Sequence, residues 1–247
     1  MVTGATSGIG EACALRFAKG GYDVIITGRR QELLDKLAAR LEELGSRVKV
    51  LCFDVRDQRQ VDEACKGLGE WADIDVLVNN AGLALGLDPL HEGSLDDWET
   101  MIDTNVKGLL YVSRALVPEM VRRNKGHIIN IGSVAGDAAY ANGGVYCATK
   151  AAVKTITDGL RIDVADTCLR VTNVKPGLVE TNFSNVRFHG DTARAEKVYQ
   201  GIKPLTGDDI ADVAFYAASA PAHVQIAEVL VLATHQASGS VVKRKAE

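Results

Sequence analysis

Short apolar runs alternate with longer helical patterns along the chain. Runs rich in β-branched residues, typical of strands, occur at 22–27, 47–53, 75–80, 126–132, about 169–176 and 228–232. Helical patterns lie between them, over 31–45, from about 57, over 94–124, over about 143–166 and after Thr206. Strands separated by helices require crossover connections, which produce a parallel sheet, and continuously apolar strands indicate helices on both faces. The pattern predicts one doubly wound α/β domain over residues 1–247.

The predicted helices carry signals at their ends. The helix over 31–45 should end at Gly45 and bury one face, formed by Leu33, Leu37, Leu41 and Leu44. Ser94 and Asp97 have the spacing of a capping box at the start of the long helix. We expect that helix to break near Asn105, and we expect Thr206 to cap the last helix.

The chain opens with MVTGATSGIG, the pattern of a strand end, a glycine-rich turn and a helix start. Such a turn lets the backbone approach a pyrophosphate, and the helix start offers free N–H groups. The spacing is not G-x-G-x-x-G, so a tight turn in some other α/β protein is the alternative. The hypothesis is that a pyrophosphate lies against the glycine loop, formed by Gly4, Gly8, Ile9 and Gly10.

Only Met1 and Val2 precede Thr3, which is short for a first strand. That strand should be central in the sheet, between the second strand (22–27) and the fourth strand (75–80). We therefore expect upstream apolar residues in the native gene product. If there are none, neighbouring segments must brace the loop.

The second predicted strand ends in Gly28-Arg29-Arg30, without the carboxylate that would bind the ribose 2′-hydroxyl of NAD. Arginine is a planar, permanently charged partner for a phosphate. The sequence therefore favours NADP, with Ser7 joining Arg29 and Arg30 around the 2′-phosphate. The alternative is that both arginines only begin a solvated helix.

Composition narrows the class of protein. The net charge of −4 gives no general attraction for nucleic acid. Five cysteines, without C-x-x-C spacing, argue against a disulfide framework or a zinc site and fit a reducing cytosol. No run is long and apolar enough to predict a membrane span, and no signal peptide is evident. We expect a cytoplasmic protein that binds neither metal, membrane nor nucleic acid.

Tyr146 and Lys150 stand four residues apart on a predicted helix, so they share a face. An ammonium nearby should lower the pKa of the phenol and let Tyr146 exchange a proton with an alcohol or carbonyl. This spacing alone is common by chance. Ser133 follows a strand, however, at the sheet edge where such folds bind ligands, and it could contact the same substrate oxygen.

These motifs, in this order, resemble the short-chain dehydrogenase/reductase family over nearly the whole chain. They are T-G-x-x-x-G-x-G, N-N-A-G, N-x-x-G, the serine, Y-x-x-x-K and P-G. The resemblance implies a Rossmann domain with a mostly parallel seven-stranded sheet. It also implies a catalytic tetrad of Asn105, Ser133, Tyr146 and Lys150.

The resemblance assigns a role to each member of the tetrad. Tyr146 would be the acid/base, and Ser133 would polarise the carbonyl. Lys150 would hold the nicotinamide ribose and lower the pKa of the tyrosine, while Asn105 would anchor a water. Further cofactor contacts implied are Asp54, Val55, Asn79, Ala81, Gly82, Pro176, Gly177, Val179 and Thr181.

Other segments, including NNAGLALG, DWETMIDTN and FSNVRFHGD, are similar to the NADP-dependent 3-hydroxy acid dehydrogenases, the group of the serine and allo-threonine dehydrogenases. That similarity implies oxidation of the C3 hydroxyl of small 3-hydroxy acids such as serine or 3-hydroxypropionate. Lys175 departs from the group, which often has a carboxylate before the Pro-Gly pair. The family pairs long helices between subunits, so Leu109, Leu110, Val112, Val153 and Ile156 suggest a homotetramer.

A small hydroxy acid needs a cation for its carboxylate. Arg187 and His189 lie in the expected substrate loop, about 177–205, and are the candidates, although both could be ordinary surface residues. The alternative functions are another NADPH-dependent carbonyl reductase, such as a 3-oxoacyl reductase, and a non-catalytic NADP sensor. A sensor fits less well, because the tetrad is complete.

Overall fold

A computed structural model describes residues 1–244 of the chain. Its strands are β1 (Val24–Gly28), β2 (Val48–Cys52), β3 (Val76–Asn79), β4 (His127–Ile131), β5 (Arg170–Pro176) and β6 (Glu228–Val231). Every pairing between them is parallel: β1 pairs with β2, and the others follow the order β3-β4-β5-β6. The predicted parallel α/β architecture is confirmed.

The amino-terminal residues join the two groups of strands. Val2 forms parallel bridges to Ile26 of β1 on one side and to Val78 of β3 on the other. Met1 O accepts a hydrogen bond from Val78 N at 2.8 Å, and Thr3 N donates to Val78 O at 3.0 Å. The expected position between the second and fourth predicted strands is therefore correct. The described residues form six strands, not the predicted seven, because Val2 pairs as a single residue on each side.

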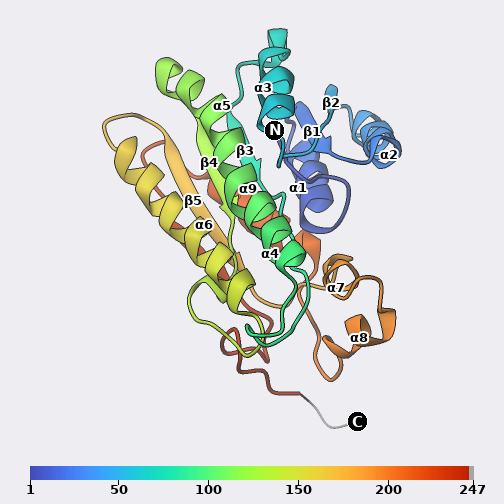
Figure 1. Cartoon of the computed structure of the whole chain (residues 1–247). Helices are drawn as coiled ribbons and strands as arrows, with labels where there is room; N and C mark the ends of the chain where they lie inside the picture. The colour runs from blue at the N-terminus through green and yellow to red at the C-terminus, as the bar shows by residue number, and fades with distance from the viewer. Residues whose placement is uncertain (245–247) are drawn as a thin grey trace.

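Helices cover both faces of this sheet. The helices that do so are α1 (Gly8–Lys19), α2 (Gln31–Glu43), α3 (Gln58–Lys66), α4 (Leu95–Ile102), α5 (Leu109–Arg123), α6 (Gly144–Asp163) and α9 (Gly207–Ser219). The short helices α7 (Phe183–Arg187) and α8 (Thr192–Lys197) lie to one side of the sheet (Figure 1). Short helical turns lie at Gly69–Trp71, Asp103–Gly108 and Val134–Gly136. Figure 1 shows α5 and α6 running along the front of the strands.

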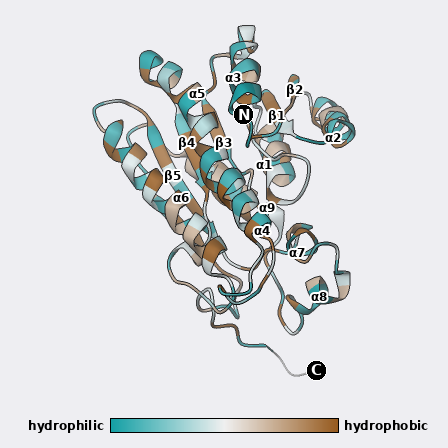
Figure 2. Ribbon diagram, viewed as in Figure 1, coloured by the Kyte–Doolittle hydropathy of each residue, from teal (hydrophilic) through white to brown (hydrophobic). Residues whose placement is uncertain are grey.

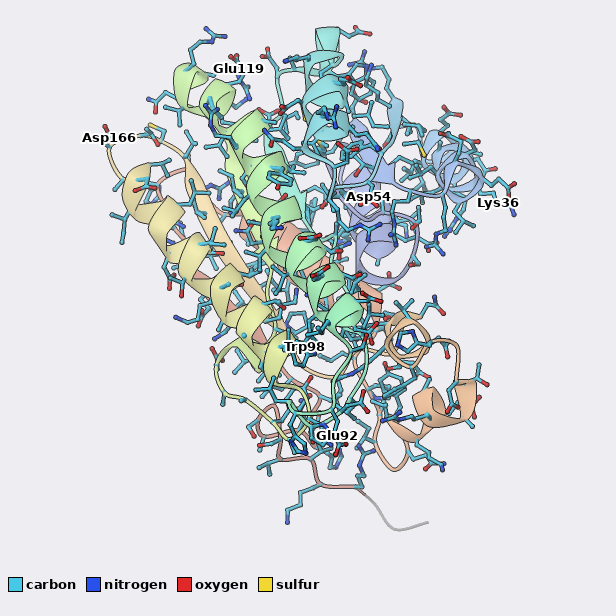
Figure 3. The ribbon with its side chains drawn as sticks, in the orientation of Figure 1. Lys36, Asp54, Glu92, Trp98, Glu119 and Asp166 are labelled. Atoms are coloured by element: carbon cyan, nitrogen blue, oxygen red, sulfur yellow. The ribbon has the colours of Figure 1, made fainter. Side chains whose placement is uncertain are left out.

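Two hydrophobic cores, one on each face of the sheet, explain why apolar strand residues are buried on both sides. Ile26, Val78 and Ile129 pack on one face with α1, α2 and α9. Their neighbours Ile25, Leu77 and Ile128 point to the other face and pack with α3 and α5. In Figure 2 the strands β4 and β5 carry brown segments beside teal ones, and the helices in front of them likewise mix teal and brown. Charged side chains such as Lys36 and Asp166 project from the outside of the molecule (Figure 3).

Two local predictions need correction. The buried face of α2 contains Leu34, Leu37 and Leu41, whereas Leu44 is exposed. At the start of α4, the Ser94 side chain accepts a hydrogen bond from Asp97 N, but the reciprocal bond of a capping box is not formed. The carboxylate of Asp97 instead binds His189 Nε2, at 3.1 Å. Thr206 does cap α9, in a full capping box with Asp209.

No helix within residues 1–244 combines the length and the apolar character that a membrane crossing requires.

Candidate functional site

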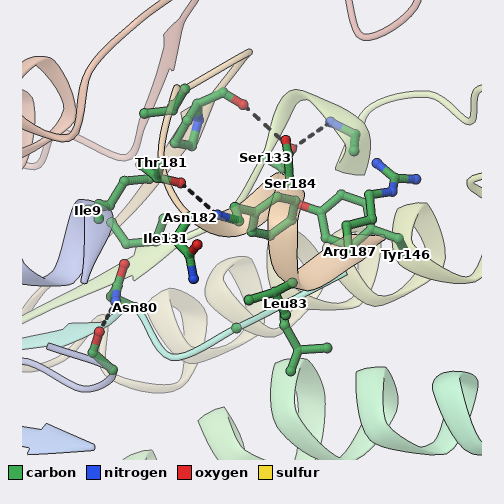
Figure 4. A pocket seen from close by; sticks show the side chains of 18 of the residues that line it. Ile9, Asn80, Leu83, Ile131, Ser133, Tyr146, Thr181, Asn182, Ser184 and Arg187 are labelled. Atoms are coloured by element: carbon green, nitrogen blue, oxygen red, sulfur yellow. Dashed lines mark hydrogen bonds between the residues drawn. The ribbon is translucent and has the colours of Figure 1, made fainter. Parts of the chain in front are cut away.

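A cavity of about 590 Å³ opens at the carboxyl ends of the strands. It extends from the glycine loop at the start of α1, past Ser133 and Tyr146, to the segment that contains α7. Figure 4 shows this cavity from close by, with Ile9 and Asn80 at one side and Tyr146 and Arg187 at the other. Parallel sheets bind ligands at this edge, so the cavity is the candidate site.

The glycine loop has the geometry of a phosphate cradle. Gly4 and Gly8 have φ values of +65° and +59°, which glycine adopts without strain. A Cβ on Gly10 would lie 2.4 Å from the Gly4 carbonyl oxygen, so a side chain there would push the loop apart. The N-cap residue of α1, Ser7, makes no side-chain capping bond, and the first-turn amides remain available to an anion. The residues present therefore fit a dinucleotide pyrophosphate.

Neighbouring segments brace this loop. Thr3 Oγ1 accepts hydrogen bonds from Asn80 N and Ala81 N, both at 3.1 Å. Asn80 Nδ2 donates to the carbonyl oxygens of Thr3 and Gly4, at 2.9 and 3.1 Å. The turn after β3 thus holds the glycine loop in place.

Arg29 and Arg30 both line the cavity, at the end of β1. Arg30 Nη2 donates to Thr6 Oγ1 at 2.7 Å and lies 3.5 Å from Ser7 Oγ, so it bends back over the glycine loop. Arg29 forms an ion pair with Asp54 at 3.7 Å and is more than half exposed. The structure thus brings Ser7, Arg29 and Arg30 together at this end of the cavity. The sequence reasoning missed Thr6, whose only signal was its place between Gly4 and Gly8.

Asp54, labelled in Figure 3, follows β2 and lines the same end of the cavity. Burial opposes ionisation of Asp54, but hydrogen bonds from Arg56 and the charges of Arg56 and Arg29 outweigh it. The pKa of Asp54 is therefore lower than usual, and the carboxylate stays charged near neutral pH.

Among the other predicted cofactor residues, Val55, Ala81, Gly82, Pro176, Gly177, Val179 and Thr181 line the cavity. Asn79 does not. Its Nδ2 donates to Asn130 Oδ1 at 2.9 Å and to Ser113 Oγ at 3.2 Å, inside the chain. Its neighbour Asn80 lines the cavity instead, because side chains alternate between the two faces at the end of β3.

Ser133, Tyr146 and Lys150 meet in the middle of the cavity, and each is less than a tenth exposed. Ser133 Oγ accepts from Ala135 N at 3.1 Å and lies 3.5 Å from the Pro176 carbonyl oxygen. Tyr146 and Lys150 share one face of α6, and Tyr146 packs edge-on against Phe183. The structure therefore brings these three residues together, the outermost of which, Ser133 and Lys150, are 17 positions apart in the sequence.

The pKa of Tyr146 differs from the prediction. Burial and the neighbouring Tyr140 raise it, whereas hydrogen bonding with Ser133 and the charge of Arg187 act to lower it, and burial dominates. Lys150 donates through Nζ to the Ile131 carbonyl oxygen at 2.9 Å, and burial lowers its own pKa to about 8. The expected acidification of Tyr146 by Lys150 is therefore not found in the chain alone, where Ser133 and Arg187 are the groups that favour the phenolate.

Asn105 lies beside the cavity, not in its lining. It occupies the π-helical turn Asp103–Gly108 between α4 and α5, where the predicted helix break occurs. Its amide binds both backbone groups of Leu83 at 2.8 Å and donates to Thr149 Oγ1 at 3.0 Å. Asn105 therefore ties α6 and the turn after β3 together next to Lys150.

Arg187 reaches the cavity and His189 does not. The guanidinium of Arg187 lies 5.8 Å from the Tyr146 ring centroid. Its Nε donates to the Gly86 carbonyl oxygen and its Nη1 to Tyr140 Oη, both at 3.1 Å, while Nη2 is buried and has no partner among the described residues. His189 is largely exposed and faces Asp97. Tyr140 was missed because it lies in a loop without a periodic pattern.

No cluster of three or more histidine, cysteine or acidic side chains suited to a metal ion occurs in the described part of the chain.

Residues 1–191 match the short chain dehydrogenase family. The NADP-dependent 3-hydroxy acid dehydrogenase of Escherichia coli is 52% identical over 228 residues, which cover 92% of this chain and 91% of that protein. The enzyme of the same name from Schizosaccharomyces pombe is 44% identical and covers 99% of this chain and 96% of its own length.

Solved structures agree with this relationship. The closed form of a serine dehydrogenase complexed with NADP+ has a TM-score of 0.93 and 48% identity, covering 99% of this chain and 98% of its own. A structure of serine dehydrogenase from Escherichia coli has a TM-score of 0.82 and 45% identity, covering 96% and 98%. Motifs, fold, site and relatives lead to one conclusion: the chain belongs to the short-chain dehydrogenase family.

Proposed function

We propose that this chain is an NADP-dependent oxidoreductase that interconverts the C3 hydroxyl of a small 3-hydroxy acid with the corresponding carbonyl. Serine, allo-threonine and 3-hydroxypropionate represent the substrate class. The observation that carries the proposal is the Arg187 guanidinium, which lies beside Tyr146 with a buried donor that has no partner among residues 1–244. A buried unpaired donor of a charged group is costly, and a substrate carboxylate would satisfy it.

The cofactor is assigned to the other end of the cavity. Gly4, Gly8, Ile9 and Gly10 are proposed to hold the pyrophosphate, and Arg29 and Arg30 the 2′-phosphate, with Thr6 and Ser7 holding Arg30 in place. The named NADP dependence of the Escherichia coli and Schizosaccharomyces pombe relatives supports this assignment. A hydride from the substrate would be taken up by NADP+ bound at these residues.

Proton transfer is assigned to Tyr146. In the oxidation direction its phenolate takes the proton of the substrate hydroxyl, and in the reduction direction its phenol returns a proton to the carbonyl oxygen. Ser133 donates a hydrogen bond to the same oxygen and holds it at the tyrosine. Lys150 is assigned to the ribose, and Asn105 to the support of Lys150 and the turn after β3. Segment 177–205 is assigned as the substrate loop.

Turnover of a panel of 3-hydroxy acids with NADP+ tests the proposed function. Arg187→Ala should lower kcat/KM on the preferred acid by about 10- to 100-fold, because a charge-assisted hydrogen bond is lost. His189→Ala is the matched control, since this basic residue of the same segment does not line the cavity and faces Asp97, and it should stay within about threefold. Unchanged kcat/KM in both variants would refute the carboxylate assignment.

The proposed assembly is a homotetramer. Leu109, Val112 and Val153 are buried within the chain itself, which corrects their assignment to a subunit interface. Leu110 on α5, Ile162 on α6, Tyr216 on α9 and Leu230 on β6 remain exposed, and apolar side chains on these elements support association. Light scattering tests it, and a monomer would contradict it.

A further inference from the structure

Lys175 is a buried lysine outside the cavity. It lies on β5, is 4% exposed, and its Nζ donates to both carboxylate oxygens of Asp137 at 2.9 and 2.8 Å. The same ammonium pairs with Glu228 of β6 at 2.5 Å. Burial acts to lower the pKa of Lys175, but the bonds to Asp137 and Glu228 outweigh it and raise the pKa. The ammonium is therefore charged near neutral pH, with two carboxylates around it.

The two carboxylates belong to different parts of the molecule. Asp137 directly follows the helical turn Val134–Gly136, whose N-cap residue is Ser133. This turn has little freedom on its other side, where a Cβ on Gly136 would lie 2.7 Å from the Lys150 carbonyl oxygen. Glu228 begins β6, at the edge of the sheet, and has no place in that turn.

The strand that carries Lys175 also carries an acceptor for Ser133. Pro176 follows Lys175, and its carbonyl oxygen lies 3.5 Å from Ser133 Oγ. Val174 O, on the other side of Lys175, accepts from Gly132 N at 2.8 Å. Lys175 thus lies between the two β5 residues whose carbonyl oxygens contact the Ser133 segment, and its side chain adds a third contact through Asp137.

We propose that Lys175 is a positioning residue, which through Asp137 fixes the Ser133 hydroxyl opposite Tyr146. The inference rests on the proposed roles of Ser133 and Tyr146. Lys175, Asp137 and Glu228 do not line the cavity, so the ion cluster acts through the turn and not by contact with a ligand. Small displacements of a group that orients a substrate are enough to lower turnover strongly.

The chain offers a matched pair of variants. Asp137→Asn and Glu228→Gln each remove one carboxylate from the same ammonium, and the two carboxylates are exposed to similar extents, 34% and 36%. Only Asp137 belongs to the Ser133 turn. Asp137→Asn should therefore lower kcat about tenfold with little change in KM or in NADPH affinity. Glu228→Gln should stay within about twofold in kcat.

A pH profile gives a second readout, which a loss of stability alone would not move. Hydrogen bonding with Ser133 favours the phenolate of Tyr146. A displaced Ser133 should raise the pKa of Tyr146, so the rise of oxidation kcat/KM with pH should shift to higher pH in Asp137→Asn. The Glu228→Gln profile should match that of the wild type.

Equal losses of kcat in the two variants, or no loss in Asp137→Asn, would overturn the positioning role. Thermal unfolding and NADPH titration of each variant show whether the folded chain is being assayed. The kcat of each variant is compared with that of the wild type on whichever alcohol or carbonyl the wild type converts. A wild type that is inactive on 3-hydroxy acids therefore refutes only the proposed substrate. If the wild type converts none of the compounds, Tyr146→Phe difference spectra isolate Tyr146 among the six tyrosines, and a Tyr146 titration that is unchanged in Asp137→Asn overturns the inference by itself.

Discussion

Lys150 and Lys175 are both nearly buried, yet they lie in opposite electrostatic surroundings. Lys150, on α6 at the cavity, donates to a backbone carbonyl, and burial lowers its pKa to about 8. Lys175, on β5 behind the cavity, binds two carboxylates that raise its pKa. The difference shows how one residue type can supply a tunable charge at one place and a fixed structural charge at another.

The largest expected effect is on turnover, at Lys150. Lys150→Met should lower kcat/KM by about 100- to 10,000-fold, because the group assigned to the ribose and the proton-transfer geometry is lost. The thermal midpoint should stay at or above that of the wild type, since no carboxylate loses its partner. Steady-state kinetics and thermal unfolding measure both. If Lys150→Met unfolded at a lower temperature than Lys175→Met, the proposed contrast between the two lysines would be wrong.

The next effect is on stability, at Lys175. Lys175→Met leaves Asp137 and Glu228 facing one another without a counter-charge, which should cost about 3 kcal/mol in the free energy of unfolding. This cost is at the lower end of the range for breaking a buried ion pair, because both carboxylates are partly exposed to solvent. Urea unfolding measures the loss. The triple variant Lys175→Met/Asp137→Asn/Glu228→Gln should recover most of it, and no recovery would show that packing, not charge, was lost.

The smallest effect is the pH dependence of stability. Burial lowers the pKa of Lys150 from 10.5 to about 8, so between these values the unfolded chain holds a proton that the folded chain has released. The free energy of unfolding should then rise with pH. From pH 8 to pH 10 the wild type should gain about 2 kcal/mol relative to Lys150→Met.

Lys175→Met is the control for that measurement. The pKa of Lys175 is raised, so its contribution is fully present below the ordinary lysine pKa and is lost only at still higher pH. The difference in the free energy of unfolding between the wild type and Lys175→Met should therefore stay constant between pH 8 and pH 10. If the wild type gains no stability relative to Lys150→Met from pH 8 to pH 10, burial does not lower the pKa of Lys150.

Much of the proposed cofactor end of the site could be predicted from sequence because its signals are local. Glycines at positions 4, 8 and 10, two arginines after a strand and the Tyr146–Lys150 spacing each report on a few neighbouring residues. Asn79 shows the limit of such reasoning, because the choice between Asn79 and Asn80 depends on which face of the sheet each side chain meets. Arg187 and His189 could be told apart only in the structure, since both are basic residues in one segment.

By itself, the sequence determined the parallel α/β fold, the glycine loop and the residues assigned to proton transfer, since periodicity and motif spacing are properties of short stretches of chain. Only the tertiary structure decided what surrounds each charge. Lys175 meets Asp137 and Glu228 from 38 and 53 positions away, and Arg187 meets Gly86 across 101 positions. The physical reason is that burial and charge pairing, which set a pKa and hold a side chain in place, depend on contacts that chain folding creates.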